Sequence, residues 1–340
     1  MGQSLTENSS STTPYDHVGV IGAGAWGTAL ALAAAQAGRR VVLWAREPEV
    51  VQSVQQNREN ALFLPGVSLP PAIVATGNIE EAAQADALLL SVPAQHVRAT
   101  LQTLQATPAL TKPIALCAKG IECGTGMLLT EVLIECGARE PAILSGPSFA
   151  NDVARCLPTA VTIAARKAVA LRLQVTLGHP TFRPYASEDL TGVALGGAAK
   201  NVYAIGCGIV AGLGLGESAR AGLLARSFAE LFRLARVLGA KEETVMGLSG
   251  LGDLVLTATS PTSRNFSFGL ALGKGATLSE LVAPERPLAE GVETASALVA
   301  RGSQHDIELP VAQTVADIVA RKLTPQDAMP RLMQRPHRSE

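Results

Sequence analysis

Lys200 is the single charged residue between Thr191 and Gly216, a stretch otherwise built almost entirely from small and apolar residues. A lysine in such surroundings is desolvated, which disfavours the ammonium form and lowers its pKa. A lysine that titrates near neutrality can give or take a proton during a reaction. The alternative is a lysine on one solvated face of a helix. Because few other polar residues surround Lys200, we predict that it acts as a general acid or base.

Two polar clusters further along the chain could serve the same chemistry. Ser263-Arg264-Asn265 places a guanidinium, which can bind a phosphate through two parallel hydrogen bonds, between two neutral hydrogen-bonding side chains. Gly250-Leu251-Gly252-Asp253 ends in a carboxylate that could orient a lysine amine. Taken alone, each cluster is better explained by helix caps and polar loops.

Two further polar residues follow apolar runs that read as strands. Lys119 comes after Ile114–Ala118, and Ser148 lies in the turn Gly146-Pro147-Ser148 after Ala142–Ser145. The carboxyl ends of strands in doubly wound sheets face the ligand crevice, so both positions are candidates for ligand contact. N–H groups of the turn and the Ser148 hydroxyl could meet an anion. A surface lysine and a structural turn explain these positions equally well.

A glycine-rich turn near the start has the spacing of a phosphate-binding loop. Gly22-Ala23-Gly24-Ala25-Trp26-Gly27 follows the apolar run His17–Ile21 and precedes an Ala/Leu-rich helix, Thr28–Gln36. The first glycine permits the tight turn, the second admits a pyrophosphate close to the backbone, and the third allows close packing of helix on strand. In this context the motif predicts dinucleotide binding rather than an ordinary glycine-rich connection.

The residues after the second predicted strand bear on which dinucleotide is bound. A carboxylate about 20 residues after the glycine loop would bind a ribose 2′-hydroxyl and favour NAD. The strand Val41–Trp44 ends without one and is followed by Arg46, which could hold a 2′-phosphate. This pattern favours NADPH, with NADH also accepted. The alternative is a solvated Arg46, with Glu47 or Glu49 reaching the ribose.

The order of elements indicates two domains. Up to about residue 187, continuous apolar strands alternate with helices, as expected for a parallel sheet buried on both faces. Beyond it, helical periodicity dominates, as in Ala221–Leu238 with Gly239 as the stop. We predict an α/β Rossmann-type doubly wound sheet domain at 15–187, an all-α helical domain at 188–330, tails at 1–14 and 331–340, and a site between the domains. The remaining predicted strands are Ile73–Ala75, Ala87–Val92 and Ala160–Ala164, and the predicted helices are Val50–Arg58, Ala94–Leu104, Met127–Glu135 and Lys167–Leu177.

Composition limits the kinds of partner. The chain is 47% apolar and 17% charged, which allows sizeable cores, and its net charge of −1 gives no reason to expect nucleic acid. Five dispersed cysteines form no metal-ligand cluster and fit a reduced, cytoplasmic protein, so no metal is predicted. The polar start lacks the features of a secretory signal. The glycine-rich stretch around Lys200 fits a buried globular helix better than a membrane span.

Together these segments resemble the bacterial-type NAD(P)-dependent sn-glycerol-3-phosphate dehydrogenases. The resemblance runs from about Val18 to Leu323. The segments that carry it, in order, are VIGAGAWGTALA, FLPGV, AKG, LSGPSFA, LPTAV, GVALGGAAKNVYAIG, GLSGLGDLVLT, SRNFSFG and LAEGVET. It implies a cytoplasmic homodimer that reduces dihydroxyacetone phosphate to sn-glycerol 3-phosphate for phospholipid synthesis.

The resemblance also implies a role for each matching residue. Lys200 matches the proton acceptor and touches the substrate. The other matching substrate contacts are Lys119, Gly146, Ser148, Asp253, Ser263, Arg264 and Asn265. The positions that match the dinucleotide site are Gly22, Gly24, Ala25, Trp26, Gly27, Arg46, Lys119, Ala150, Arg264, Leu288 and Glu290. Ala25 departs from the serine found in many members, which removes one side-chain hydrogen bond to a phosphate.

Two other classes remain open at this stage. A ketopantoate- or 3-hydroxyacid-type reductase also pairs a dinucleotide domain with a helical domain and a lysine, but it binds carboxylates and does not need the phosphate grip of Ser263-Arg264-Asn265. A non-enzymatic dinucleotide sensor would need a DNA-binding element or a basic face, which the sequence does not indicate.

Overall fold

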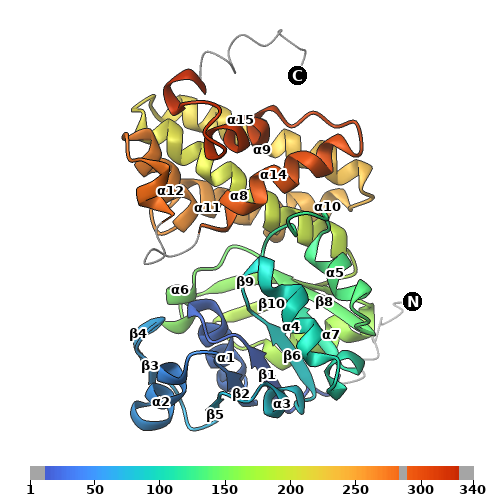
Figure 1. Cartoon of the computed structure of the whole chain (residues 1–340). Helices are drawn as coiled ribbons and strands as arrows, with labels where there is room; N and C mark the ends of the chain where they lie inside the picture. Colours follow the sequence, from blue (N-terminus) through green and yellow to red (C-terminus); the bar gives the residue numbers. More distant parts are fainter. Residues whose placement is uncertain (1–11, 283–288, 329–340) are drawn as a thin grey trace, which may run out of the picture.

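The computed structural model describes residues 12–282 and 289–328, which form an α/β part and a helical part stacked end to end (Figure 1). The predicted fold class, a doubly wound sheet domain followed by a helical domain, is confirmed. The last strand of the sheet ends at Ser187 and the first long helix of the helical part begins at Leu190. The domain limits 15–187 and 188–330 stay predictions. Most of the predicted tail 1–14 and all of 331–340 lie outside the described residues.

One eight-stranded sheet forms the α/β part, in the order β10-β9-β8-β7-β6-β1-β2-β5. Its strands are β1 (His17–Ile21), β2 (Arg40–Trp44), β5 (Ile73–Thr76), β6 (Ala87–Leu90), β7 (Pro113–Leu116), β8 (Glu140–Ser145), β9 (Thr159–Ala165) and β10 (Phe182–Ser187). The expectation of a parallel sheet holds from β5 to β8 and is wrong for β9, which pairs antiparallel with β8. The helix between them, α6 (Ala150–Ala154), packs on the helix after the glycine loop and forms no crossover on the sheet.

Two apolar clusters lie on the two faces of this sheet. Leu88 and Leu90 of β6 belong to one cluster and Leu89 to the other, because successive side chains of a strand point to opposite faces. One face is covered by α3 (Ile79–Ala83), α4 (Val97–Leu104) and α5 (Leu129–Glu135), and the other by α1 (Ala25–Gln36), α2 (Pro48–Asn57) and α7 (Lys167–Leu177). Two 3₁₀ turns, Ala94–His96 and Pro108–Thr111, flank α4, and a small hairpin of β3 (Glu59–Asn60) and β4 (Leu64–Ser68) lies beside α1.

The helical part is built around α8 (Leu190–Gly212), whose first turns also contact β8 and β9. Among the described residues, α8 is the one helix long and apolar enough to cross a membrane, and its apolar window is 100% buried inside the protein. The prediction of a buried globular helix is therefore confirmed. Around it lie α9 (Glu217–Val237), α10 (Glu242–Met246), a π-helical turn (Leu248–Gly252), α11 (Asp253–Thr259), α12 (Arg264–Gly273), α13 (Leu278–Leu281), α14 (Glu290–Ser303) and α15 (Pro310–Val319).

Glycines bring α8 and α12 into backbone contact. A Cβ on Gly208 would lie 2.1 Å from the carbonyl oxygen of Phe266, and a Cβ on Gly269 would lie 2.0 Å from that of Ile205. Both distances are far below van der Waals contact, so only glycine fits at these crossings. The close approach draws the start of α12, where Arg264 stands, towards the segment of α8 that carries Lys200.

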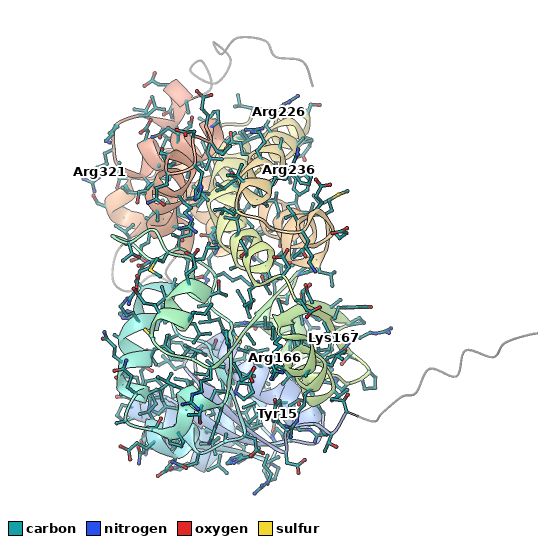
Figure 2. All side chains as sticks on the ribbon, turned by 90° about the vertical axis from the view of Figure 1, so that its right-hand side faces the viewer. Tyr15, Arg166, Lys167, Arg226, Arg236 and Arg321 are labelled. Atoms are coloured by element: carbon teal, nitrogen blue, oxygen red, sulfur yellow. The ribbon has the colours of Figure 1, made fainter. Side chains whose placement is uncertain are left out.

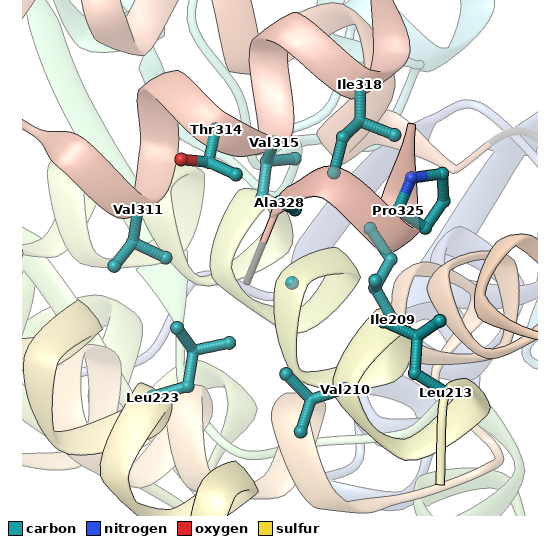
Figure 3. A pocket seen from close by; sticks show the side chains of 11 residues that line it. Ile209, Val210, Leu213, Leu223, Val311, Thr314, Val315, Ile318, Pro325 and Ala328 are labelled. Carbon is teal, nitrogen blue, oxygen red and sulfur yellow. The ribbon is translucent and has the colours of Figure 1, made fainter. Parts of the chain in front are cut away.

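A small apolar cavity lies behind α8, between α9 and α15 (Figure 3). Its lining includes Val210, Leu223 and Val315, and its volume of about 20 Å³ has room for roughly one water molecule. It is too small for a substrate and is remote from Lys200 along α8.

Exposed basic side chains are spread over both parts of the molecule, with Arg166 and Lys167 on the α/β part and Arg226, Arg236 and Arg321 on the helical part (Figure 2).

Candidate active site

Asp253 lies between the ammonium groups of two lysines. Its Oδ1 is 2.5 Å from Nζ of Lys200, and its Oδ2 is 2.6 Å from Nζ of Lys119. Asp253 is fully buried and Lys200 is 6% exposed. Lys119 follows β7 at the carboxyl edge of the sheet, Lys200 lies in the middle of α8, and Asp253 begins α11. The structure thus brings together three predicted site residues at the junction of the two parts.

Burial and the neighbouring charges set the protonation of this cluster. Burial and, to a lesser extent, the charge of Lys119 lower the pKa of Lys200 to about 7, against the opposing effect of the Asp253 carboxylate. Burial alone would raise the pKa of Asp253, but the ammonium groups of Lys119 and Lys200 outweigh burial and hold it below its usual value. Asp253 is therefore ionised at neutral pH, while Lys200 can exchange a proton there.

The π-helical turn before α11 sets the position of Asp253. A Cβ on Gly250 would lie 1.9 Å from the carbonyl oxygen of Val245, and a Cβ on Gly196 would lie 2.6 Å from that of Ser249. Glycine at position 250 therefore lets the turn close on the end of α10, and glycine at position 196 lets the turn pack directly on α8. π-helical turns of this kind occur frequently at functional sites. Here the turn delivers the Asp253 carboxylate to Nζ of Lys200.

Two polar residues complete the cluster without having been singled out in the sequence. The hydroxyl of Thr257 accepts a hydrogen bond from Nζ of Lys200 at 3.0 Å. The side chain of Asn201 donates to the carbonyl oxygen of Lys119 at 3.2 Å. Thr257 lies four residues after Asp253, on the same helix face, which is the local signal that could have identified it. Asn201 directly follows Lys200, but its partner is distant in sequence.

The start of α12 forms the wall next to this cluster. Ser263 caps the helix, its Oγ accepting from the N–H of Phe266 at 3.2 Å. Asn265 is buried; it donates to Oδ1 of Asn201 at 3.0 Å and accepts from the N–H of Gly291 at 2.9 Å. Arg264 between them is exposed. The cap and the buried amide thus fix the helix end, and the guanidinium stands free of the protein interior.

The glycine loop at the end of β1 has the geometry that its spacing predicts. Gly22 has a φ of 109°, and a Cβ there would lie 2.6 Å from the carbonyl oxygen of Ser91. A Cβ on Gly27 would lie 1.8 Å from the carbonyl oxygen of Gly22, which explains the tight strand–helix packing. Among the residues that the structure describes, none lies within 4 Å of a Cβ on Gly24, so this part of the chain leaves the loop open there. Ala25 and Trp26 form the first turn of α1, whose N–H groups have no intrahelical partners.

Other predicted ligand contacts lie at the same edge of the sheet. Gly146 follows β8, and the Ser148 hydroxyl donates to its carbonyl oxygen at 3.0 Å. Ala150 begins α6, which packs on α1. Burial raises the pKa of Glu290, at the start of α14, against the opposing influence of Arg264, Lys119 and Lys200.

Arg46 lies apart from the lysine cluster. Its guanidinium is exposed and pairs with Oε1 of Glu47 at 2.7 Å, beyond the end of β2. Leu288 lies outside the described residues. Within the described ranges 12–282 and 289–328, no group of three or more His, Cys, Asp or Glu side chains is placed to hold a metal ion.

The glycines predict a paired test of the loop. Gly24→Val is expected to keep the fold, because its side chain enters open space, and to weaken dinucleotide binding about 10- to 100-fold by blocking contact with the backbone. Gly27→Val is expected instead to lower the thermal midpoint, because its side chain meets the Gly22 carbonyl. Fluorescence titration with NADH and thermal unfolding measure the two effects. Unchanged affinity in Gly24→Val would show that the loop does not bind the cofactor.

A glycine loop at the switch point of a doubly wound sheet, with a buried Lys–Asp–Lys cluster at the same carboxyl edge, defines a two-domain dinucleotide-dependent dehydrogenase. Two family profiles agree: NAD-dependent glycerol-3-phosphate dehydrogenase N-terminus matches residues 17–170, and NAD-dependent glycerol-3-phosphate dehydrogenase C-terminus matches residues 189–330. The chain belongs to the NAD-dependent glycerol-3-phosphate dehydrogenase family.

Comparisons with individual proteins support this family membership over nearly the whole chain. The chain is 56% identical over 331 residues to a glycerol-3-phosphate dehydrogenase (NAD(P)+) of Parvibaculum lavamentivorans, covering 97% of this chain and 99% of the relative. It is 51% identical to the enzyme of that name from Rhodospirillum rubrum, covering 96% and 94%. The crystal structure of glycerol-3-phosphate dehydrogenase from Coxiella burnetii matches with a TM-score of 0.90 and 37% identity, covering 95% and 99%. A ketopantoate reductase from Ralstonia eutropha, at 15% identity and a TM-score of 0.57, shares the fold alone.

Proposed function

We propose that this NAD(P)-dependent dehydrogenase reduces dihydroxyacetone phosphate reversibly to sn-glycerol 3-phosphate, with Lys200 carrying the proton. The observation that supports this most directly is the buried ammonium of Lys200, 2.5 Å from Asp253 and with a pKa lowered to about 7. In ketone reduction the protonated Lys200 donates to the substrate oxygen, and in alcohol oxidation the neutral amine accepts the proton. Asp253 orients Lys200, and Lys119 adds positive charge beside the developing alkoxide.

The residues present fit a dinucleotide. The open space at Gly24 and the first turn of α1 suit a pyrophosphate, and Nε1 of Trp26 is buried with no hydrogen-bond partner in the described part of the chain. Gly22, Ala25, Gly27, Lys119, Ala150, Arg264 and Glu290 would line the rest of the site. When bound, the reduced nicotinamide supplies the hydride for the ketone carbon.

Initial rates with dihydroxyacetone phosphate and with ketopantoate, each with NADPH and with NADH, test the proposed function. We expect turnover of the phosphorylated ketone with both cofactors and none of the carboxylate, because a guanidinium and two neutral side chains at the start of α12 suit a phosphate. Ketopantoate reduction without dihydroxyacetone phosphate reduction would identify the alternative reductase. Absence of turnover with every phosphorylated ketone would favour a dinucleotide sensor.

Arg264 is expected to bind the substrate phosphate, together with Asn265 and Ser263. Arg264→Lys keeps the charge and loses the two-pronged geometry, so KM for dihydroxyacetone phosphate should rise about tenfold or more. Activity with unphosphorylated dihydroxyacetone should stay unchanged and serves as the control. An equal loss with both ketones would contradict a phosphate-specific role and indicate damage to the shared machinery.

Arg46 is expected to favour NADPH by binding its 2′-phosphate. In Arg46→Gln, KM for NADPH should rise about tenfold while KM for NADH stays constant, since one charge-assisted bond is lost. Arg40→Gln, an exposed arginine at the opposite end of β2, is the matched control. If wild-type activity with NADH exceeds that with NADPH manyfold, Glu47 or Glu49 is the better candidate for the ribose contact.

We also propose that the protein acts as a cytoplasmic homodimer and that its product feeds phospholipid synthesis. Family membership supports both proposals. Sedimentation equilibrium of the full chain should give twice the monomer mass of 35.1 kDa. A monomer at micromolar concentration would refute the dimer without affecting the proposed reaction.

A further inference from the structure

Strand β4 of the hairpin β3–β4 carries most of the FLPGV segment, residues 63–67, to which the reaction assigns no role, and strand β3 carries a fully buried asparagine. Asn60 is 0% exposed. Its Nδ2 donates to the carbonyl oxygen of Ala23 and to Oγ1 of Thr28, both at 2.8 Å. Its Oδ1 accepts from the N–H of Phe63 at 3.1 Å, which fixes the orientation of the amide. The side chain therefore links the hairpin to the glycine loop.

The bond to Ala23 determines where the next N–H points. A trans peptide is planar, and its carbonyl and N–H point in opposite directions. With the Ala23 carbonyl held towards Asn60, the N–H of Gly24 is turned away from the hairpin. Thr28 reinforces the same carbonyl through its hydroxyl at 3.3 Å. Gly24 is also the position of the loop with open space around it, where a pyrophosphate can approach.

We propose that Asn60 is a positioning residue for the dinucleotide, locking the Ala23–Gly24 peptide in the orientation that binds the pyrophosphate. A loop already held in its binding orientation loses less conformational freedom when the cofactor arrives, which increases affinity. Asn60 acts through the backbone of the loop, from the side opposite to the cofactor. The inference rests on the cofactor assignment of the proposed function and is independent of the substrate.

Two substitutions separate the hydrogen bonds from the packing. Asn60→Asp keeps the shape but puts a carboxylate oxygen against the Ala23 carbonyl, where the amide donated a hydrogen bond. Asn60→Ala removes both donors and leaves the carbonyl with Thr28 alone. We expect affinity for NADH to fall about tenfold in Asn60→Ala and further in Asn60→Asp, because a buried acceptor loses its partner. At saturating cofactor, kcat should stay unchanged.

Binding of cofactor fragments locates the effect. ADP-ribose contains the pyrophosphate without the nicotinamide, and AMP lacks the pyrophosphate. Titrations of the full-length protein should show equal losses for NADH and ADP-ribose and none for AMP. Thr176→Val is the matched control. Thr176 lies in α7, away from the glycine loop, and its buried hydroxyl accepts a hydrogen bond from the N–H of Tyr15 at 3.0 Å. It should lower the thermal midpoint without changing either affinity.

Thr28→Val keeps the test valid if both Asn60 variants fail to fold. It removes the hydroxyl that accepts from Asn60 and nearly preserves the shape, so it should weaken ADP-ribose binding by a smaller factor. Folded variants that bind ADP-ribose like the wild type, or that lose AMP affinity equally, would overturn the inference. A wild-type protein that binds ADP-ribose but does not reduce dihydroxyacetone phosphate would refute the proposed reaction and leave this inference intact.

Discussion

Replacing Lys200 by methionine is expected to lower kcat for dihydroxyacetone phosphate reduction by about 10³-fold, the scale of a lost general acid. Methionine has a similar length and suits a position that is 6% exposed. The variant has no ammonium group that Asp253 could hold next to the reacting oxygen of the substrate. Steady-state assays measure the loss, and titration with NADH should give unchanged affinity. Lys274→Met, an exposed lysine at the end of α12, is the control and should keep full activity.

The pH dependence of the wild type tests the same group. With a pKa of about 7, Lys200 is protonated below neutrality and neutral above it. Ketone reduction requires the protonated form, so kcat/KM should fall as the pH rises through about 7. Alcohol oxidation requires the neutral form, so kcat/KM should fall as the pH drops through the same value. Lys200→Met that retains more than about a tenth of wild-type turnover would contradict a general acid–base role.

Asp253→Asn is expected to have the largest effect on stability. It leaves the ammonium groups of Lys119 and Lys200 near each other without their shared counter-charge. Removing one partner of a buried ion pair costs about 3–5 kcal/mol, so the free energy of unfolding at pH 7 should drop by that order. The loss should be greatest at acidic pH and shrink as the pH rises towards 7, because the pKa of Lys200, no longer raised by the Asp253 carboxylate, falls below about 7 and the unpaired ammonium releases its proton. Activity should fall as well, since Lys200 is no longer oriented.

Denaturant unfolding of wild type and variant at pH 7 and at lower pH measures this effect. Asp306→Asn is the matched control: Asp306 is an exposed aspartate with a φ of 57°, a conformation that asparagine tolerates. It should leave both stability and kcat unchanged. A loss for Asp253→Asn that is independent of pH would mean that packing, rather than unpaired charge, is the cause.

Local patterns in the sequence predict most of the sheet domain. β1 and α7 begin and end at the predicted residues. The sequence does not predict β10, because it is an edge strand whose first residues alternate buried and exposed, with Arg183 and Tyr185 outward. The sequence does not predict the hairpin β3–β4 either, because its strands are short and β4 contains a proline. The reversed direction of β9 has no local signal, since pairing direction depends on where the connecting chain packs.

The candidate active site likewise combines residues that the local sequence predicts with residues that it does not predict. The residue types at Lys119, Lys200 and Asp253 indicated proton transfer and anion binding, and the structure brings these three together. Asn60 and Asn201 gave no signal, because an asparagine reads as an ordinary polar residue until its partners are known. Those partners, Ala23 for Asn60 and Lys119 for Asn201, lie 37 and 82 residues away in the chain.

Two properties of this protein follow from local sequence alone. The glycine loop encodes its own strand–turn–helix geometry, because the constraints on Gly22 and Gly27 act over a few residues. The apolar surroundings of Lys200 encode its burial and hence its lowered pKa. Two others appear only when the chain is folded: Lys119 and Lys200 share the carboxylate of Asp253, and Asn60 holds the glycine loop from the side of the hairpin. Hydrogen bonds and charge pairs depend on distance through space, and the packing of separate elements sets that distance.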